Sequence, residues 1–351
     1  MATPAGVRAD FPHMGDVVMA NGFDRATAHV GGSNYLWYGL GPDCDRSSYG
    51  VLPNYHRPGV RAQAQQQLAT MHARGMRSLS IGVAFRDGNG SDNVIDASVP
   101  AQVNQTAQNL YIMLGDIQAA GFERVLFRFF PQANMNPSFP DFDGGTVGLY
   151  WQLVQAMHAQ LSATFLPYRI DLGVELAPAD KGDVFCDFPP KQYEWQCPAD
   201  KAWSNAVRQL WRNYKQAYGT LDSVGFSFLG GTDQAKRRMR HMKYVYEGDY
   251  PSRVAMDLYG EASHDEGDQF INLASWLRHY SDSYGFPLPD ITISETWYND
   301  PMAAATLSSA ISATGHEVAW LSQWPLQRGA SCSDVSVPPP YQYDMNLMYG
   351  F

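Results

Sequence analysis

The sequence has few charged residues and little lysine, and this scarcity excludes several kinds of protein. Of 351 residues only 17% are charged, whereas 45% are hydrophobic and 13% are aromatic. This composition is the opposite of that of a disordered chain, so we expect a folded protein with a large core. Lysine and arginine number 25 against 35 acidic residues, for a formal net charge of −10. That charge disfavours binding to the phosphate backbone of nucleic acids.

Long apolar runs are also missing from the sequence. No stretch approaches the ~20 residues that are needed to span a bilayer, so we expect no membrane span. The first residues, Met1–Gly6, lack both the charged and the apolar region of a secretory signal peptide. The protein is therefore either cytoplasmic or a secreted chain from which the signal has been removed.

Cysteine is scarce too, with four in the chain. Cys186 and Cys197 lie eleven positions apart in a segment rich in proline, aspartate and aromatic residues, where a disulfide would hold a loop together. Cys44 and Cys332 form the other possible pair. Unpaired thiols or a metal site are alternatives, but no Cys-x-x-Cys motif or histidine cluster favours a metal. We expect two disulfides and a secreted or periplasmic location.

Apolar segments rich in β-formers alternate with amphipathic helical segments along the chain. Eight segments are predicted as strands: Ala26–His29, Ser78–Ala84, Arg124–Phe129, Arg169–Val174, Ser223–Leu229, Arg253–Leu258, Ile291–Glu295 and Val318–Ser322. Seven segments are predicted as helices: Gln63–Arg74, Gln105–Ala120, Gly148–Ala163, Ala202–Tyr218, Asp233–Tyr244, Gln269–Tyr284 and Pro301–Thr314. This alternation predicts parallel βαβ units.

Eight such units predict an α/β fold, a (β/α)₈ barrel that forms one domain over residues 1–351. A doubly wound open sheet is the competing architecture, but the segment His29–Asn34 lacks the Gly-x-Gly-x-x-Gly phosphate turn. No linker or charge block marks a second domain. Long loops follow the first four strands, at 36–61, 87–102, 131–146 and 178–201. In a barrel these loops gather at the C-terminal face, where active sites lie.

Two glutamates stand at the ends of predicted strands. Glu175 follows the fourth strand and Glu295 ends the seventh. A carboxylate at the end of an apolar strand is costly to bury unless it is paired or used in chemistry, and pairing with an arginine is the alternative for Glu175. Strands four and seven face each other across a small barrel. Two carboxyl groups across a cleft are what retaining glycosidases use as acid/base and nucleophile.

At these residues the chain resembles the large clan of retaining (β/α)₈ glycoside hydrolases whose catalytic glutamates end strands four and seven. The resemblance rests on Glu175, on the sequence Ser-Glu-Thr-Trp around Glu295, on a tyrosine after strand six and on a tryptophan after strand eight. It implies that Glu175 is the acid/base and Glu295 the nucleophile. It also implies that Tyr259 contacts the nucleophile and that Trp324 forms the floor under the sugar.

Several further residues could complete a sugar site. Arg86, at the end of strand two, could keep the nucleophile ionised, and Arg128 within strand three is its rival for this role. Loop aromatics such as Trp37 and Trp297 could stack on sugar rings, although local packing explains each of them equally well. Val174 stands where the clan has an asparagine that holds the sugar 2-hydroxyl, which implies either an unusual sugar or a different contact to that hydroxyl.

Other catalytic motifs are absent from the sequence. It contains no Gly-x-Ser-x-Gly elbow, no Walker loop and no His-Glu-x-x-His motif, and its nine histidines lack ligand spacing. The expected reaction requires neither a metal nor an organic cofactor. We therefore expect a retaining, endo-acting glycosidase whose partner is a poly- or oligosaccharide. A barrel that binds carbohydrate without cleaving it is the main alternative, and a hydrolase or isomerase for a small non-sugar substrate is another.

Overall fold

The computed structural model describes residues 33–38, 48–73, 75–136, 142, 144–176, 198–230, 242, 245–251, 253–260, 265–297, 300–316, 318–324 and 328–329. The four cysteines expected to form disulfides (Cys44, Cys186, Cys197 and Cys332) lie outside these ranges, as do the strand predicted at Ala26–His29 and most of the helix predicted at Asp233–Tyr244. Within the described ranges, no helix has both the length and the apolar character needed to cross a membrane.

Parallel strands form the centre of the molecule. They are β1 (Ser33–Tyr35), β2 (Ser78–Arg86), β3 (Ile95–Asp96), β4 (Arg124–Pro131), β5 (Tyr168–Asp171), β6 (Ser223–Gly225), β7 (Phe228–Leu229), β8 (Arg253–Asp257), β9 (Asp290–Glu295) and β10 (Val318–Gln323). Their order in the sheet is β6-β5-β4-β2-β1-β10-β9-β8-β7, and the short β3 pairs with β2. The order follows the chain around a ring, as a barrel requires.

The ring closes through the fifth predicted strand, which is broken into β6 and β7. The first piece pairs with β5, with Ser223 opposite Ile170, and the second pairs with β8, with Phe228 opposite Met256. Only Phe226 and Ser227 separate the two pieces. Because the chain itself joins the two ends of the ladder, the predicted (β/α)₈ barrel is confirmed.

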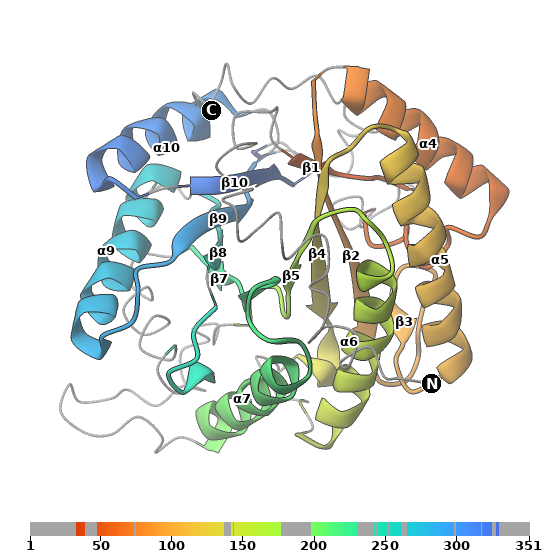
Figure 1. Cartoon of the computed structure of the whole chain (residues 1–351), viewed down its shortest axis with the longest axis horizontal. Helices are drawn as coiled ribbons and strands as arrows, with labels where there is room; N and C mark the ends of the chain where they lie inside the picture. The colour runs from red at the N-terminus through yellow and green to blue at the C-terminus, as the bar shows by residue number, and fades with distance from the viewer. Residues whose placement is uncertain are drawn as a thin grey trace.

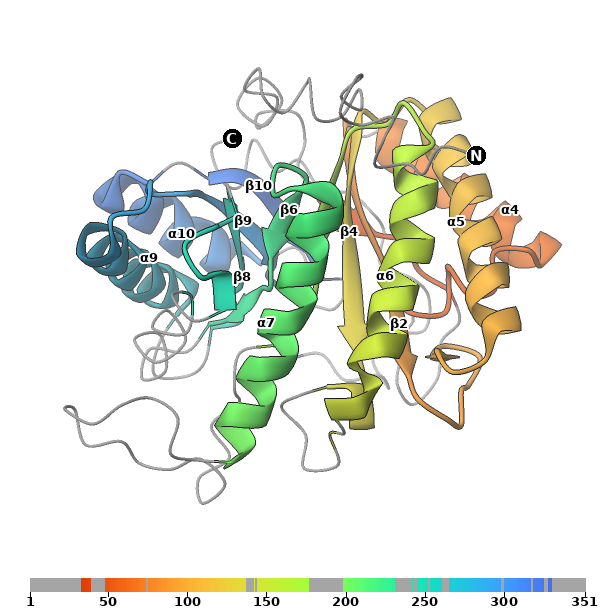
Figure 2. The ribbon, with the colours of Figure 1, turned by 60° about the horizontal axis from the view of Figure 1, so that its bottom comes forward.

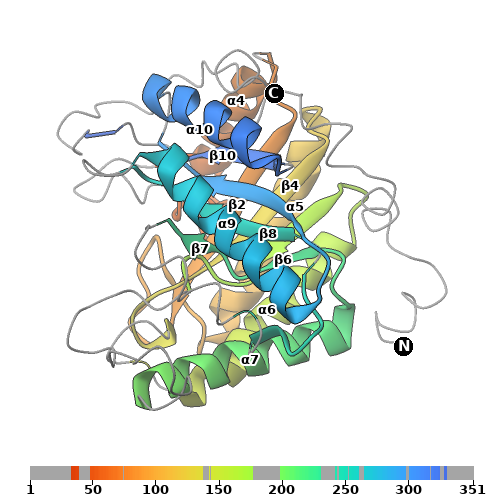
Figure 3. The ribbon, with the colours of Figure 1, turned by 90° about the vertical axis from the view of Figure 1, so that its left-hand side faces the viewer.

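Helices surround this ring (Figures 1 and 2). They are α4 (Pro58–Ala73), α5 (Pro100–Ala119), α6 (Val147–Ser162), α7 (Pro198–Tyr218), α9 (Glu266–Tyr284) and α10 (Pro301–Thr314), with short 3₁₀ turns η2 (Ala133–Met135) and η3 (Gly144–Thr146). Four of the helices begin at proline, which suits a first turn because its missing N–H would have no partner there. Figure 3 shows α9 and α10 covering the side of β8 to β10.

Most strands differ from their predicted bounds by one or two residues, and two larger differences bear on the site. The ring position between β10 and β2 is filled by Ser33–Tyr35, not by the predicted Ala26–His29, and the Tyr35 side chain is buried among aromatic rings. β5 ends at Asp171 instead of Val174. The chain after Asp171 leaves the ladder, and this departure carries Glu175 beyond the strand.

Polar side chains lie inside the barrel beside Arg128, which makes room there for a charged group. Val125, Phe127 and Phe129 of β4 pack into the core between the ring and the helices. Side chains alternate along a strand, so Arg124 and Arg128 face the interior. Below Arg128, the hydroxyl groups of Ser80 and Ser322 are 2.6 Å apart. The small side chains of Ser80 and Ser322 leave room for the guanidinium of Arg128, which lies nearer to the C-terminal end of the strands.

Gly82 lies opposite Arg128 in the ladder and has no space for a side chain. A Cβ at Gly82 would lie 2.4 Å from the carbonyl oxygen of Arg128 and 2.6 Å from the ring of Phe130. We expect Gly82→Ala to lower the free energy of unfolding by about 1–3 kcal/mol, because overpacking forces the backbone to shift. Urea unfolding measures this change.

Gly115→Ala is the control for this substitution. Gly115 lies within the exposed face of α5, and a Cβ there would meet nothing within 4 Å. This variant should be more stable by about 0.5–1 kcal/mol, since alanine favours a helix over glycine. Equal effects of the two substitutions would contradict the described packing.

Candidate active site

Glu295 is the last residue of β9 and its carboxylate is held from three strands. Tyr35 on β1 donates to Oε1 at 3.2 Å, and Arg128 on β4 also donates to Oε1. Tyr259, just after β8, donates to Oε2 at 2.6 Å. The side chain is almost completely buried. Both carboxylate oxygens therefore have fixed partners, and the orientation of the group is determined by the barrel.

Arg128 is fully buried and contacts three carboxylates at once. Its Nε donates to Asp171 at 2.9 Å, and its Nη2 donates to both oxygens of Asp257 at 3.0 and 2.8 Å. The third partner is Glu295. Tyr35 accepts a further bond from Nη1 at 2.8 Å. A buried cation is tolerated only with such partners. Because Asp171, Asp257 and Glu295 each end a strand, the cluster holds the strands together at the C-terminal, or upper, end of the barrel.

Three buried acids around one cation cannot all ionise without cost. Burial raises the pKa of Glu295 to about 8; Arg128 acts against this, while Asp257 and Glu175 add to it. Burial likewise raises the pKa of Asp171. Arg128 itself stays charged, since the carboxylates outweigh the effect of its burial and raise its pKa further. At Glu295 the effect of burial therefore outweighs that of Arg128, and the carboxyl group keeps its proton more readily than an exposed glutamate does.

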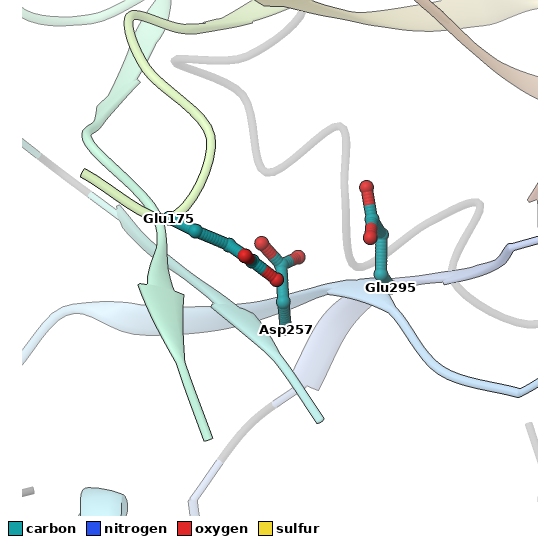
Figure 4. A group of neighbouring side chains, drawn as sticks. All are labelled: Glu175, Asp257 and Glu295. Atoms are coloured by element: carbon teal, nitrogen blue, oxygen red, sulfur yellow. The ribbon is translucent and has the colours of Figure 1, made fainter. Parts of the chain in front are cut away.

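Glu175 lies four residues beyond the end of β5, on a turn. Its φ of +52° is in the left-handed region that non-glycine residues rarely adopt. Its backbone N–H donates to the hydroxyl of Ser227 at 3.0 Å. One carboxylate oxygen from each of Glu175, Asp257 and Glu295 lies within 4.8 Å of the others (Figure 4). The turn therefore brings Glu175 to the nucleophile candidate predicted from the sequence.

This group of three acids has the oxygen donors that a hard cation prefers. However, two of its members, Asp257 and Glu295, already share the guanidinium of Arg128. A metal ion at this place would have to compete with a positive charge that the protein itself supplies. The side chains are therefore described better as an arginine–carboxylate cluster than as a metal centre.

Aromatic side chains lie next to the carboxylates. The Trp324 ring meets the Tyr35 ring edge to face, with centroids 5.0 Å apart, and belongs to a cluster with Tyr49 and Phe130. The Trp297 ring lies 4.8 Å from that of Tyr259. The residues expected to bind sugar after strands six, seven and eight are thus brought together beside Glu295.

The structure removes Trp37 from this site, and it shows no contact between Arg86 and Glu295 among the described residues. Trp37 is only 1% exposed and packs in the main core, where Gln67 of α4 holds its backbone. A ring without exposed surface cannot stack on a substrate, so we no longer assign Trp37 to substrate binding. Arg86 lies opposite Asp96 at the end of β2. Among the described contacts, Arg128 and not Arg86 holds the Glu295 carboxylate.

Sequence reasoning missed three members of the cluster: Tyr35, Asp171 and Asp257. Asp257 ends β8 just as Glu295 ends β9, and the two are paired in register. An acidic residue at the end of an apolar strand was therefore a signal that pointed to Asp257 as well. Tyr35 could not be found in this way, because the first strand was predicted at a different place.

No protein-family model matches this sequence, and neither does any curated protein. Among solved structures, the catalytic domain of a family 26 endo-β-1,4-mannanase from Bacillus sp. JAMB-750 is similar, with a TM-score of 0.55 and 10% identity over 97% of this chain and 90% of that one. A modular endo-β-1,4-mannanase from Cellulomonas fimi gives a TM-score of 0.52 and 11% identity, over 96% and 74%.

An exo-β-1,4-mannosidase from Opitutaceae bacterium strain TAV5 is also similar in structure. Its TM-score is 0.52 and its identity 12%, over 92% of this chain and 58% of that one. At such identities the likeness shows the barrel fold, and that fold is shared by three glycoside hydrolases. What these proteins act on does not by itself transfer to this chain.

The raised pKa of Glu295 predicts a dependence of stability on pH. A carboxyl group with a native pKa of about 8 keeps its proton in the folded state between about pH 5 and 8 but loses it in the unfolded state. The native state then binds more protons, so this group makes stability fall as pH rises through that window. Glu295→Gln removes this contribution.

We therefore compare wild type and Glu295→Gln by urea unfolding from pH 5 to 8. The free energy of unfolding of the wild type minus that of the variant should decrease as pH rises, by at most about 1.4 kcal/mol per pH unit. Glu123→Gln, at an exposed position, controls for loss of a carboxyl group elsewhere. A difference that stays constant across the window would contradict the proton retention described for Glu295.

Proposed function

We propose that this protein is a retaining glycosidase in which Glu295 is the nucleophile and Glu175 the acid/base. The observation that carries the proposal is the distance of no more than 4.8 Å between carboxylate oxygens of the two glutamates. Retaining enzymes hold their carboxyl groups about 5–5.5 Å apart, whereas inverting enzymes need about 6.5–9.5 Å to admit a water. The short separation favours direct attack by one carboxylate.

In the first step, an oxygen of Glu295 attacks the anomeric carbon while Glu175 donates a proton to the glycosidic oxygen. The bond from that carbon to the leaving oxygen breaks, and a covalent glycosyl-enzyme forms. In the second step, Glu175 takes a proton from water, the water oxygen attacks the anomeric carbon, and Glu295 leaves as a carboxylate. Two inversions at the same carbon give net retention.

The partners of Glu295 suit this role. Arg128 acts against the burial that raises the pKa of Glu295 to about 8, so it favours the ionised form, which is the form that attacks and which becomes more abundant as pH rises toward 8. Tyr259 and Tyr35 hold the two oxygens in place, so the attacking group is oriented before substrate arrives. In the glycosyl-enzyme one oxygen of Glu295 is esterified, and these donors then stabilise the carboxylate that is released in the second step.

The substrate class follows from the walls of the site. Trp297 is partly exposed and offers a ring on which the apolar face of a sugar stacks. Trp324 is 8% exposed and contributes a smaller surface, and Val174 packs against the aromatic cluster that contains Trp324. The net charge of −10 disfavours polyanionic glycans. Together with the mannan-active enzymes of the same fold, these features support a neutral, β-1,4-linked polysaccharide that is cut internally.

A polysaccharide substrate also supports a place of action outside the cytoplasm. Such a chain does not cross a membrane, so the enzyme that cuts it must be exported. The two disulfides expected between Cys186 and Cys197 and between Cys44 and Cys332 belong to this part of the proposal, since an oxidising compartment permits them. Mass spectrometry of the unreduced protein would find both bridges or refute the pairing.

The first functional experiment offers the wild type a panel of glucomannan, β-1,4-mannan, hydroxyethyl cellulose and mixed-linkage β-glucan. Reducing ends and product sizes measure cleavage, and early ¹H NMR spectra identify the anomer released. We expect short oligosaccharides whose new reducing ends first appear as the β-anomer. Release of the α-anomer would refute retention, and tight binding without cleavage would favour the non-catalytic barrel.

Two variants assign the glutamates in this assay. Glu295→Gln should abolish cleavage, because an amide cannot form the glycosyl-enzyme. Glu175→Gln should reduce kcat by about 10²–10⁴-fold, which is the usual contribution of a general acid/base. Full activity in either variant would remove that residue from its assigned role.

Tyr259→Phe tests the hydrogen bond to Oε2 of Glu295. A hydrogen bond to a charged group contributes about 1.5–3 kcal/mol, so kcat should fall by about 10- to 100-fold with little change in KM. Tyr150→Phe is the control, since Tyr150 is buried more deeply than Tyr259 and its hydroxyl donates to the backbone of Leu172 instead of to Glu295. Equal losses of kcat in both variants would show that Tyr259 acts only through packing.

A further inference from the structure

The break in the fifth strand places one serine between the two proposed catalytic glutamates. Ser227 lies between β6 and β7 and is buried. Its backbone N–H donates to the carbonyl of Gly173 at 3.1 Å and to Oδ1 of Asp171 at 3.2 Å. These bonds tie the residue to the chain that leads from β5 to Glu175. The interruption is therefore an ordered part of the barrel.

The Ser227 hydroxyl uses all of its hydrogen-bonding capacity within the cluster. It donates to Oδ2 of Asp257 at 3.1 Å. It accepts from Nη2 of Arg128 at 3.0 Å and from the backbone N–H of Glu175 at 3.0 Å. A hydroxyl has one proton and two lone pairs, so the three contacts fix its orientation completely.

A chain of hydrogen bonds through this hydroxyl links the two glutamates. Arg128 binds Glu295 with Nη1 and Ser227 with Nη2, and Ser227 holds the backbone of Glu175. The turn at Glu175 needs such support, because a left-handed backbone is unfavourable for a residue with a side chain. Loss of the hydroxyl would leave the turn free to relax toward an ordinary conformation.

We propose that Ser227 is a positioning residue that sets the place of the acid/base Glu175 relative to the nucleophile. This inference rests on the proposed function, because it takes Glu175 as the proton donor. Ser227 touches no reacting atom; it acts through the backbone of Glu175. Its removal should therefore impair protonation of the leaving group and leave the attack by Glu295 largely intact.

Aryl glycosides with different leaving groups separate these two effects. The probes are the phenyl and 2,4-dinitrophenyl β-glycosides of the disaccharide unit that the polysaccharide assay identifies. Phenolate needs a proton as it departs, whereas dinitrophenolate leaves without one. The ratio kcat/KM reports the steps up to the first bond cleavage, so only the phenyl substrate depends on Glu175 in this ratio.

For Ser227→Ala we expect kcat/KM to fall by about 10- to 100-fold with the phenyl substrate, as for a small misplacement of a catalytic group, and by less than about threefold with the dinitrophenyl substrate. Ser227→Thr keeps a hydroxyl and should restore much of the loss. Thermal unfolding of each variant shows that it is folded.

Ser223→Ala is the matched control. Ser223 is also fully buried in the fifth strand, and its hydroxyl also bonds the chain of β5, at the carbonyl of Ile170 at 3.0 Å. Among the described contacts, the Ser223 hydroxyl bonds only the backbone of Ile170 and Gly225 and not the arginine–carboxylate cluster, so Ser223→Ala should change kcat/KM for both substrates by the same small factor. A loss that depends on the leaving group in this variant would overturn the assignment to Ser227.

The outcomes separate the failure of this inference from failure of the proposed function. Equal losses with both substrates in Ser227→Ala, or no loss at all, would overturn the positioning role while Glu175→Gln still shows the dependence on the leaving group. If Glu175→Gln itself shows no such dependence, or if the wild type cleaves neither substrate, the proposed function fails and the role of Ser227 falls with it.

Discussion

The contact of Arg128 with its carboxylates is the interaction on which the upper end of this barrel depends. One buried guanidinium joins Asp171 on β5, Asp257 on β8 and Glu295 on β9, and it reaches Tyr35 on β1 as well. A buried charge that loses a partner costs several kcal/mol. The strands are therefore tied to one another at the level where the proposed chemistry takes place, and the cation that stabilises the fold also controls the proposed nucleophile.

The two glutamates have different surroundings, and the difference matches their proposed roles. Glu295 is nearly inaccessible and bound through both oxygens, whereas Glu175 is half-buried on a turn beyond its strand. A group that attacks a carbon benefits from a fixed orientation, and one that passes a proton to and from water needs access to solvent. Asp257 lies close to both and connects them to Ser227 and Arg128.

Much of the barrel could be predicted from the pattern of strands and helices, because each apolar segment faces a core whose period is visible in the sequence. Seven of the eight predicted strands coincide with strands of the ring, the fifth of them in two pieces. The first strand could not be placed, since Ser33–Tyr35 is only three residues long and is defined by pairing with β2 and β10. Glu175 and Glu295 were visible because one follows an apolar strand and the other ends one, but the choice between Arg86 and Arg128 was open.

By itself, the sequence determined the kind of molecule: a folded, acidic α/β chain with eight strand-forming segments and acidic residues at the ends of two of them. Those properties depend on composition and local period. Only the tertiary structure decided which arginine meets Glu295, that Trp37 belongs to the core, and that Ser227 joins both glutamates. These contacts link residues dozens to more than a hundred positions apart, and the closure of the ring brings them together, which no local pattern specifies.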